Sequence, residues 1–115
     1  MLLKKDSIPQ EEELDPMGGV GHLLLEHMAE ALSLPTAVCG FSRATLAPGA
    51  EVGYHVHDTD SEVYYILSGI GEYCDGAATY RVEAGDVSYT PRGEGHGIRN
   101  VGDGELEFIA LSLLA

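Results

Sequence analysis

The sequence predicts an all-β chain, folded as a sandwich or a small barrel. Glycine supplies 15 of the 115 residues, about twice its average share, which is typical of a chain with many tight turns. From residue 36 onward, short apolar stretches are separated at even intervals by turn residues. The length fits one domain with one hydrophobic core.

Each predicted strand ends at a recognisable turn. Pro48-Gly49 closes the first strand, Asp58-Thr59-Asp60 the second and Ser68-Gly69 the third. The dipeptide Asp75-Gly76 predicts a two-residue hairpin turn between two strands. The predicted strands span residues 37–46, 51–57, 62–67, 71–74, 77–82, 87–90, 95–101 and 105–114.

The first 34 residues differ in composition from the rest. Residues 1–19 contain the acidic run Glu11-Glu12-Glu13, and we expect a solvated, partly disordered arm. Residues 20–34 fit either an amphipathic helix or a short buried strand, and periodicity leaves both open. The predicted organisation is therefore an acidic arm, 1–19, and a single domain, 20–115.

The charge balance of the chain limits the kinds of molecule that it can bind. Six Lys and Arg against 19 Asp and Glu give a net charge of −13, which disfavours nucleic acid and anionic membranes. No apolar run approaches 18 residues, and the first residues do not resemble a secretory signal, so we expect a cytoplasmic protein. Cys39 and Cys74 form no CxxC motif and are expected to be free thiols.

Four residues of the β region form a candidate metal site. His55 and His57 are two residues apart, which places both imidazoles on one face of a strand. Glu62 follows after a turn that brings it back beside the pair, and His96 comes from a distant segment. Three imidazoles and a carboxylate suit a divalent transition metal, with Mn or Fe(II) favoured by the carboxylate and Zn or Ni possible.

These four residues lie within a longer pattern that resembles the two signature motifs of the cupin superfamily. The resemblance covers residues 36–113 and implies a double-stranded β-helix, the cupin jelly-roll barrel, with a short N-terminal arm. It also implies that Asn100 closes a loop. The motif residues are Gly49, His55, His57, Glu62 and Gly69, then Gly85, Pro91, Gly93, His96 and Asn100.

Within that superfamily, residues 53–67 resemble small single-domain cupins related to oxalate decarboxylases. The resemblance implies a small carboxylate as substrate or ligand and a homodimer, for which residues 20–34 could supply the surface. Three departures stand out: this is one cupin domain rather than two, Val52 stands where those enzymes carry an arginine, and residues 70–84 form a hairpin too short for a lid.

Strand alternation sorts the residues around the site. It places Tyr64, Ile66 and Ile98 inward with the ligands, and Tyr54 and Val56 outward. Tyr64 is thereby a candidate catalytic residue.

A carboxylate substrate would also need a cation. Arg43 is the candidate for that role, although a surface position is an equal alternative.

Three functions fit this pattern. The first is a metal-dependent enzyme acting on a small organic acid, with oxalate decarboxylation as the example that the resemblance suggests. The second is an Fe(II)-dependent dioxygenase, because four protein ligands leave two positions open on an octahedral ion. The third is a non-catalytic module that binds a small molecule through the metal.

Overall fold

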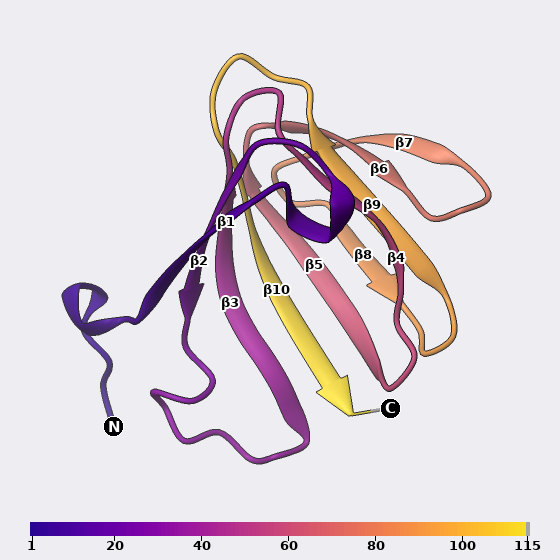
Figure 1. The fold of residues 1–115 in the computed structure, drawn as a ribbon. Helices are drawn as coiled ribbons and strands as arrows, with labels where there is room; N and C mark the ends of the chain where they lie inside the picture. The colour runs from indigo at the N-terminus through magenta and orange to yellow at the C-terminus, as the bar shows by residue number, and fades with distance from the viewer. Residues whose placement is uncertain (115) are drawn as a thin grey trace.

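The computed structural model describes residues 1–114, which form ten β-strands and two single-turn 3₁₀ helices (Figure 1). The 3₁₀ turns are η1 (Lys5–Ser7) and η2 (Pro16–Gly18). The all-β prediction is confirmed. The strands are β1 (Gln10–Leu14), β2 (His22–His27), β3 (Val38–Leu46), β4 (Glu51–Val56), β5 (Asp60–Ser68), β6 (Ile70–Cys74), β7 (Thr79–Glu83), β8 (Val87–Thr90), β9 (Gly95–Asn100) and β10 (Leu106–Leu114).

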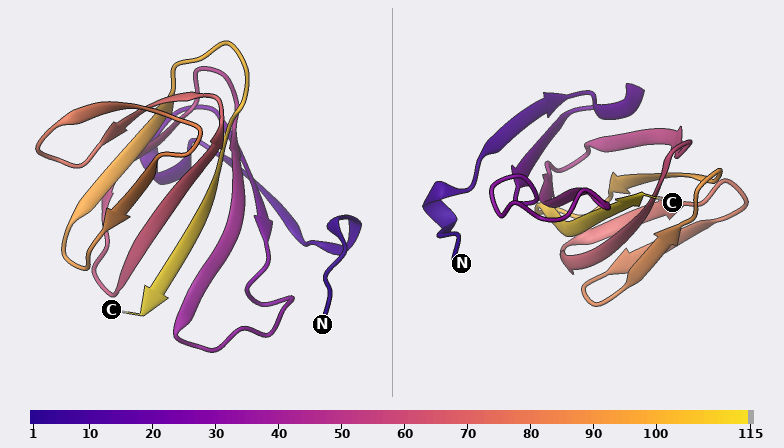
Figure 2. Two further views of the ribbon diagram at one scale, coloured as in Figure 1. Left: turned by 180° about the vertical axis from the view of Figure 1, so that it is seen from behind. Right: turned by 90° about the horizontal axis from the view of Figure 1, so that it is seen from below.

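The strands form two antiparallel sheets that face each other. One has six strands in the order β1-β2-β3-β10-β5-β8, and the other has four in the order β4-β9-β6-β7. Figure 2 shows the two layers from behind and from below. The chain crosses between the sheets at several of its turns, so consecutive segments contribute to opposite walls of one interior.

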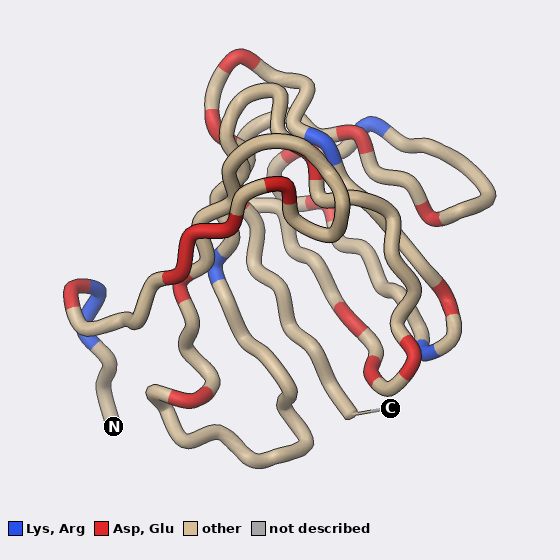
Figure 3. Tube along the Cα trace, in the orientation of Figure 1, with Lys and Arg blue, Asp and Glu red and all other residues tan. Residues whose placement is uncertain are grey.

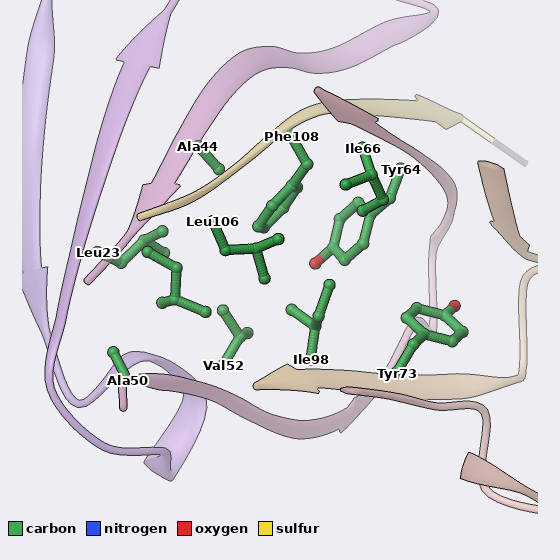
Figure 4. Close-up of a cluster of buried hydrophobic side chains, with 11 residues drawn as sticks. Leu23, Ala44, Ala50, Val52, Tyr64, Ile66, Tyr73, Ile98, Leu106 and Phe108 are labelled. Atoms are coloured by element: carbon green, nitrogen blue, oxygen red, sulfur yellow. The ribbon is translucent and has the colours of Figure 1, made fainter. Parts of the chain in front are cut away.

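The core lies between the two sheets. Figure 4 shows side chains of β3, β5 and β10 pointing toward those of β4, β6 and β9. The alternation that places Tyr64, Ile66 and Ile98 inward and Tyr54 and Val56 outward is confirmed by their burial. The buried apolar residues are Leu23, Ala44, Leu46, Ala50, Val52, Tyr64, Ile66, Tyr73, Ile98, Leu106 and Phe108.

The N-terminal segment is more ordered than the sequence predicts. Residues 10–14 form β1, which pairs with β2, so the expectation of a disordered tail is wrong for the acidic run. Its carboxylates contact histidines across the strand pair: Glu12 lies 3.0 Å from His22 and Glu11 lies 2.8 Å from His27. Pairing partners distant in sequence therefore offset the local repulsion between the acidic residues.

Residues 20–34 also resolve into one of the two alternatives. His22–His27 form β2, and a turn follows it. Leu23 of this strand is buried in the core. In a helix the side chains would repeat every 3.6 residues, so a different set of residues would face the core. The division of the chain at residue 19 remains a prediction.

The hairpin of β6 and β7 has a longer loop than the predicted two residues. Cys74 pairs with Thr79, so residues 75–78 form the loop. Asp75 Oδ1 accepts hydrogen bonds from the backbone N–H groups of Ala77 and Ala78, at 2.9 Å each. These backbone N–H groups, that of Ala78 first, lower the pKa of Asp75. The aspartate side chain thus closes a wider turn than Asp-Gly alone indicates.

Asn100 closes a loop, as the resemblance implies. Its Nδ2 donates to the carbonyls of Leu46 at 2.9 Å and Gly104 at 2.8 Å, and its Oδ1 accepts from the N–H of Gly102 at 3.0 Å. The Asn100 side chain thus supplies a hydrogen-bond partner to three backbone groups, and these bonds hold the loop closed.

The remaining expectations concern the surface. Figure 3 shows the acidic residues along β1 and in many of the loops. Cys39 and Cys74 are free cysteines. Within the part of the chain that the structure describes, no helix is long and apolar enough to cross a membrane.

Candidate metal centre

The fold brings His55, His57, Glu62 and His96 together between the sheets. One ligand atom from each lies within 4.8 Å of the others. His55 is on β4, His57 follows its end, Glu62 is on β5 and His96 is on β9. The four-stranded sheet therefore supplies the imidazoles, and the six-stranded sheet supplies the carboxylate.

Local irregularity in β4 helps to place the two histidines. His55 pairs with His96 of β9, and the register between these strands shifts between Val52 and His55. The backbone N–H of His57 donates to the carbonyl of Glu94 at 3.0 Å, which continues the strand pairing past β4. Such a shift changes the direction of the side chains that follow it.

The orientation of the imidazoles leaves lone pairs facing inward. His55 Nδ1 donates to the carbonyl of Gly53 at 2.7 Å, and His57 Nδ1 donates to Asp60 Oδ1 at 2.9 Å. A carbonyl oxygen and a carboxylate are hydrogen-bond acceptors, so Nδ1 is assigned as the donor in each ring and Nε2 is left with the lone pair. The Nε2 atoms therefore have the form that binds a metal.

Several electron-rich atoms lie close together at this point. Glu62 Oε1 lies 3.3 Å from His57 Nε2 and 3.0 Å from His96 Nε2, and the two Nε2 atoms are 3.0 Å apart. Glu62 Oε1 is buried and has no hydrogen-bond partner. A buried, unpaired carboxylate oxygen facing an imidazole lone pair is costly unless a cation lies between them. The residues present therefore fit a divalent metal.

The protonation equilibria favour the same ligand forms. Burial is the main reason that the pKa of His55 lies below 6.5, so its imidazole is neutral at pH 7. Burial alone would raise the pKa of Glu62. The polar contacts of Glu62 with His96 and Ser112 are the main causes that outweigh burial and lower that pKa below 4.5.

Further side chains orient the ligands. Thr90 Oγ1 and the Tyr73 hydroxyl lie 2.9 Å and 3.1 Å from His96 Nδ1, and 3.0 Å from each other. Ser112 Oγ donates to Glu62 Oε2 at 2.9 Å. Together with Asp60 these residues were not identified from the sequence. Asp60 is close to His57 in the chain, but the other three come together only through the sheet pairing.

A cavity of about 560 Å³ opens beside the ligands. Its walls include Leu25, Val52 and Phe108 from the sheets, and Pro16 and Met17 from the N-terminal segment. Among residues 1–114, no lysine or arginine lines it, and its charged residues are acidic or ligand residues. An anionic guest would therefore find no fixed positive side chain in these walls.

Tyr64 lies where the sequence places it. Its ring is buried and stacks on that of His96, with centroids 4.6 Å apart. Burial raises the pKa of Tyr64 well above 10, and the Glu62 charge adds to this, so the hydroxyl keeps its proton at neutral pH.

Arg43, by contrast, does not reach the cavity. Its neighbours on β3, Ser42 and Ala44, line the cavity, so Arg43 points to the opposite face of the sheet. There its guanidinium bonds Glu107 and lies 3.8 Å from Glu26. The bond with Glu107 is the main cause of a raised pKa for Arg43. The surface alternative is therefore the one that the structure supports.

Comparison with known proteins identifies the family. A family model described as "Cupin domain" matches residues 42–112. The chain is 35% identical over 114 residues to an oxalate-binding protein of Thermotoga maritima, covering 99% of this chain and 94% of that protein. It is 38% identical over 72 residues to the oxalate decarboxylase OxdC of Bacillus subtilis, covering 58% of this chain but only 19% of that enzyme.

A solved structure supports the same assignment. A crystal structure from Thermotoga maritima, described as a predicted oxalate decarboxylase, aligns over all of both chains with 36% identity and a TM-score of 0.90. A sugar phosphate isomerase structure from Silicibacter pomeroyi shares the fold, with a TM-score of 0.83 and 22% identity over 100% of this chain and 76% of that one. The jelly-roll barrel expected from the motifs is therefore confirmed, and the chain belongs to the cupin family.

Proposed function

We propose that this protein binds a divalent transition metal through His55, His57, Glu62 and His96, and through it a small carboxylate such as oxalate. The observation that carries the proposal is the unpaired, buried Oε1 of Glu62 among the imidazole nitrogens. The mixed nitrogen and oxygen donors favour Mn or Fe(II), with Zn and Ni as weaker candidates. The similarity to an oxalate-binding protein supports the choice of ligand.

The charge of the cavity supports a role for the metal in holding an anion. Glu13, Asp58 and Asp60 line the cavity beside the ligands. An oxalate dianion would be repelled by these carboxylates. A bound divalent cation would supply the compensating positive charge and a Lewis acid for the carboxylate oxygens. Oxalate binding should therefore depend on the metal.

Decarboxylation of the bound acid is a second candidate, favoured by Tyr64. Loss of CO₂ from oxalate requires a proton to take its place on the remaining carbon, which yields formate. Tyr64 lies in the cavity wall with its hydroxyl protonated at neutral pH, so a proton is available beside the site, although burial makes this hydroxyl a weak acid. The similarity to an oxalate decarboxylase covers 58% of this chain and supports this candidate.

Titration calorimetry tests binding directly. Oxalate is titrated into protein loaded with Mn, into protein loaded with Fe(II) and into metal-free protein. We expect binding only with metal present, and its loss in His57→Ala. His22→Ala is the matched control, since His22 is exposed on β2 away from the site. Equal oxalate binding with and without metal would overturn the proposal.

Product analysis separates binding from catalysis. Formate and CO₂ released in equal amounts without O₂ consumption would support decarboxylation, and Tyr64→Phe should then slow it. Consumption of O₂ by the Fe(II) form would instead favour a dioxygenase. Saturable binding without any turnover would identify a metal-dependent binding module.

A further inference from the structure

The cavity beside the metal ligands is much larger than oxalate. Its volume of about 560 Å³ lies within the range of pockets that enclose drug-sized ligands, roughly 300–1,000 Å³. Oxalate consists of two carbon and four oxygen atoms, so most of this space would remain unfilled beside it. The lining of the remaining space therefore indicates what else the ligand carries.

Small side chains on two central strands create this space. The cavity-lining residues of β3 are Gly40, Ser42 and Ala44, and those of β10 include Ala110 and Ser112. The two strands are paired, with Ser42 opposite Ala110 and Gly40 opposite Ser112. A Cβ atom built at Gly40 would meet nothing closer than Ser112, 3.8 Å away, so the space beside the backbone is open. Larger residues at these positions would fill the interior to the usual packing density.

The polarity of this wall falls with distance from the metal ligands. Ser112 of β10 pairs with Glu62 at the polar end. The next residues of β10 that line the cavity are Ala110 and Phe108, and both are apolar. From Ser112 to Phe108 the strand rises by about 13 Å, at about 3.3 Å per residue. The cavity thus runs from the ligand side chains to an apolar end.

Apolar side chains from both sheets form that end. Figure 4 shows Leu23 of β2, Val52 of β4 and Phe108 of β10 gathered in one part of the interior. All three line the cavity, and so does Leu25, which pairs with Ala44, the partner of Phe108. A polar group without a hydrogen-bond partner is costly against such walls, whereas an apolar group is stabilised by burial there. This end therefore suits an uncharged, apolar group.

The charges around the cavity disfavour a ligand with a second anionic group. Glu13, Asp58 and Asp60 also line the cavity, and Glu13 pairs with Leu23 of the apolar end. Among residues 1–114, no lysine or arginine is found in this lining. A ligand with a carboxylate at each end would bring its second charge close to acidic or apolar side chains, without a cation to balance it. The ligand should thus carry one anionic head, held by the metal.

We propose that the ligand of this cavity is a 2-oxo monocarboxylic acid with a branched aliphatic tail. The inference rests on the proposed metal site, because the metal would hold the head of the acid. A 2-oxo acid presents adjacent carboxylate and carbonyl oxygens, as oxalate presents two adjacent carboxylate oxygens. Four protein ligands leave two positions open for such a pair on an octahedral ion. The tail extends past Ala110 toward Phe108 and Leu25, where its burial stabilises the complex.

Titration calorimetry on Mn-loaded protein compares acids that differ in one feature each. Oxalate tests the proposed function itself, and pyruvate supplies the 2-oxo head with only a methyl group. The acid 4-methyl-2-oxopentanoate adds the branched tail, whereas 2-oxoglutarate adds a second carboxylate. We expect 4-methyl-2-oxopentanoate to bind roughly tenfold or more tightly than pyruvate, with a more negative heat-capacity change. We expect 2-oxoglutarate to bind no tighter than pyruvate.

The variant Ala110→Leu tests the path of the tail. Its larger side chain would occupy the wall between the metal ligands and Phe108. We expect binding of 4-methyl-2-oxopentanoate to weaken about tenfold or more, while pyruvate and Mn bind as in the parent protein. Ala77→Leu is the matched control, because it makes the same change in the exposed loop between β6 and β7. Circular dichroism and Mn content establish that both variants are folded.

The outcomes separate this inference from the proposed function. Tighter binding of 4-methyl-2-oxopentanoate than of pyruvate, lost in Ala110→Leu but kept in Ala77→Leu, supports the inference. If oxalate binds but 4-methyl-2-oxopentanoate binds no tighter than pyruvate, the inference is overturned and the metal-dependent carboxylate site stands. Unchanged binding of 4-methyl-2-oxopentanoate to folded Ala110→Leu would also overturn the inference, since the tail would then lie elsewhere. If none of the acids binds to the Mn-loaded protein, the proposed function fails and the inference fails with it.

Discussion

Asp60 Oδ1 lies 2.9 Å from His57 Nδ1, on the side of the imidazole opposite Glu62. The carboxylate fixes the tautomer of His57 and makes its Nε2 a stronger donor to a metal. The same bond keeps the ring oriented toward the other ligands. Asp60 is therefore a positioning residue whose effect should appear in metal affinity.

Replacing that carboxylate should weaken metal binding without destroying the site. We expect Asp60→Ala to lower the affinity for Mn about 10- to 100-fold, measured by competition with a chelator. Asp58→Asn is the control, because Asp58 also lines the cavity but its carbonyl, not its side chain, bonds Arg92. Equal affinities in the two variants would contradict the assigned role of Asp60.

Removing the charge of Glu62 should greatly reduce the affinity for metal but change the stability of the metal-free protein only a little. Glu62→Gln loses the anionic ligand, and we expect metal affinity to fall on the order of 100-fold or more. The metal-free variant should lose only the limited stabilisation that the lowered pKa of Glu62 reports, because the neutral amide that replaces the carboxylate can donate to an imidazole. Chelator competition and urea unfolding measure the two quantities.

Ser112→Ala provides the comparison for Glu62. It removes the single hydrogen bond to Glu62 Oε2 and leaves the charge in place. We expect a smaller loss of metal affinity and a loss of stability of about 1 kcal/mol. If Glu62→Gln strongly destabilised the metal-free protein while keeping its metal affinity, Glu62 would be a structural residue and not a ligand.

Stability of the metal-free protein should fall as the pH falls. The pKa of His55 is lowered from 6.5 in the folded state, mainly by burial, so the unfolded chain binds more protons near and below that pH. The pKa of Glu62 is lowered from 4.5, which extends the loss of stability to more acidic pH. We expect the free energy of unfolding to decrease from pH 7.5 to pH 5.5 and again below pH 4.5.

Urea unfolding at these pH values checks the direction. His55→Gln should reduce the decrease between pH 7.5 and pH 5.5, whereas the exposed-site variant His22→Ala should leave the contribution of His55 intact. Acid should also release bound metal, since protonated imidazoles cannot coordinate it. Full metal occupancy at pH 4 would argue against histidine ligands.

Gly53 has a steric role beside the site. A Cβ atom at this position would lie 2.2 Å from the carbonyl oxygen of Met17, closer than any real contact permits. The carbonyl of Gly53 also accepts the hydrogen bond from His55 Nδ1. We expect Gly53→Ala to destabilise the protein by about 2 kcal/mol or more and to weaken metal binding, as both the turn and His55 must shift.

The matched control is Gly104→Ala. Space around Gly104 is open within 4 Å, and its φ lies outside the region that favours glycine. The thermal unfolding midpoint and the metal affinity of the Gly104→Ala variant should match those of the parent protein. A Gly53→Ala variant with parental stability and metal affinity would show that the turn at Met17 moves freely.

The candidate site illustrates what strand alternation can and cannot predict. His55, His57, Glu62 and His96 were predicted to converge because their spacing matches a motif, and the structure brings them together. Alternation also predicted the burial of Tyr64, since its position relative to Glu62 lies within one strand. These predictions depend on local geometry and one known pattern.

Features that depend on partners distant in sequence were missed. The direction of Arg43 was left open between the cavity and the surface, and the burial of Ala44 and Leu46 on the same strand decides it in favour of the surface. The pairing of the acidic strand β1 with β2 has no local signal, because charge repulsion alone predicts a disordered segment. Ser112 joins Glu62 only because β10 pairs with β5.

The division of ligands between the sheets has a mechanical consequence. Glu62 belongs to the six-stranded sheet, and the three imidazoles belong to β4, its continuation and β9 of the other sheet. An ion held by all four would act as a cross-link between the two layers, much as a disulfide ties distant segments. Binding of the ion would slow the separation of the two sheets. Slower amide hydrogen exchange in β5 and β9 would therefore report that the metal site is occupied, even when no substrate is known.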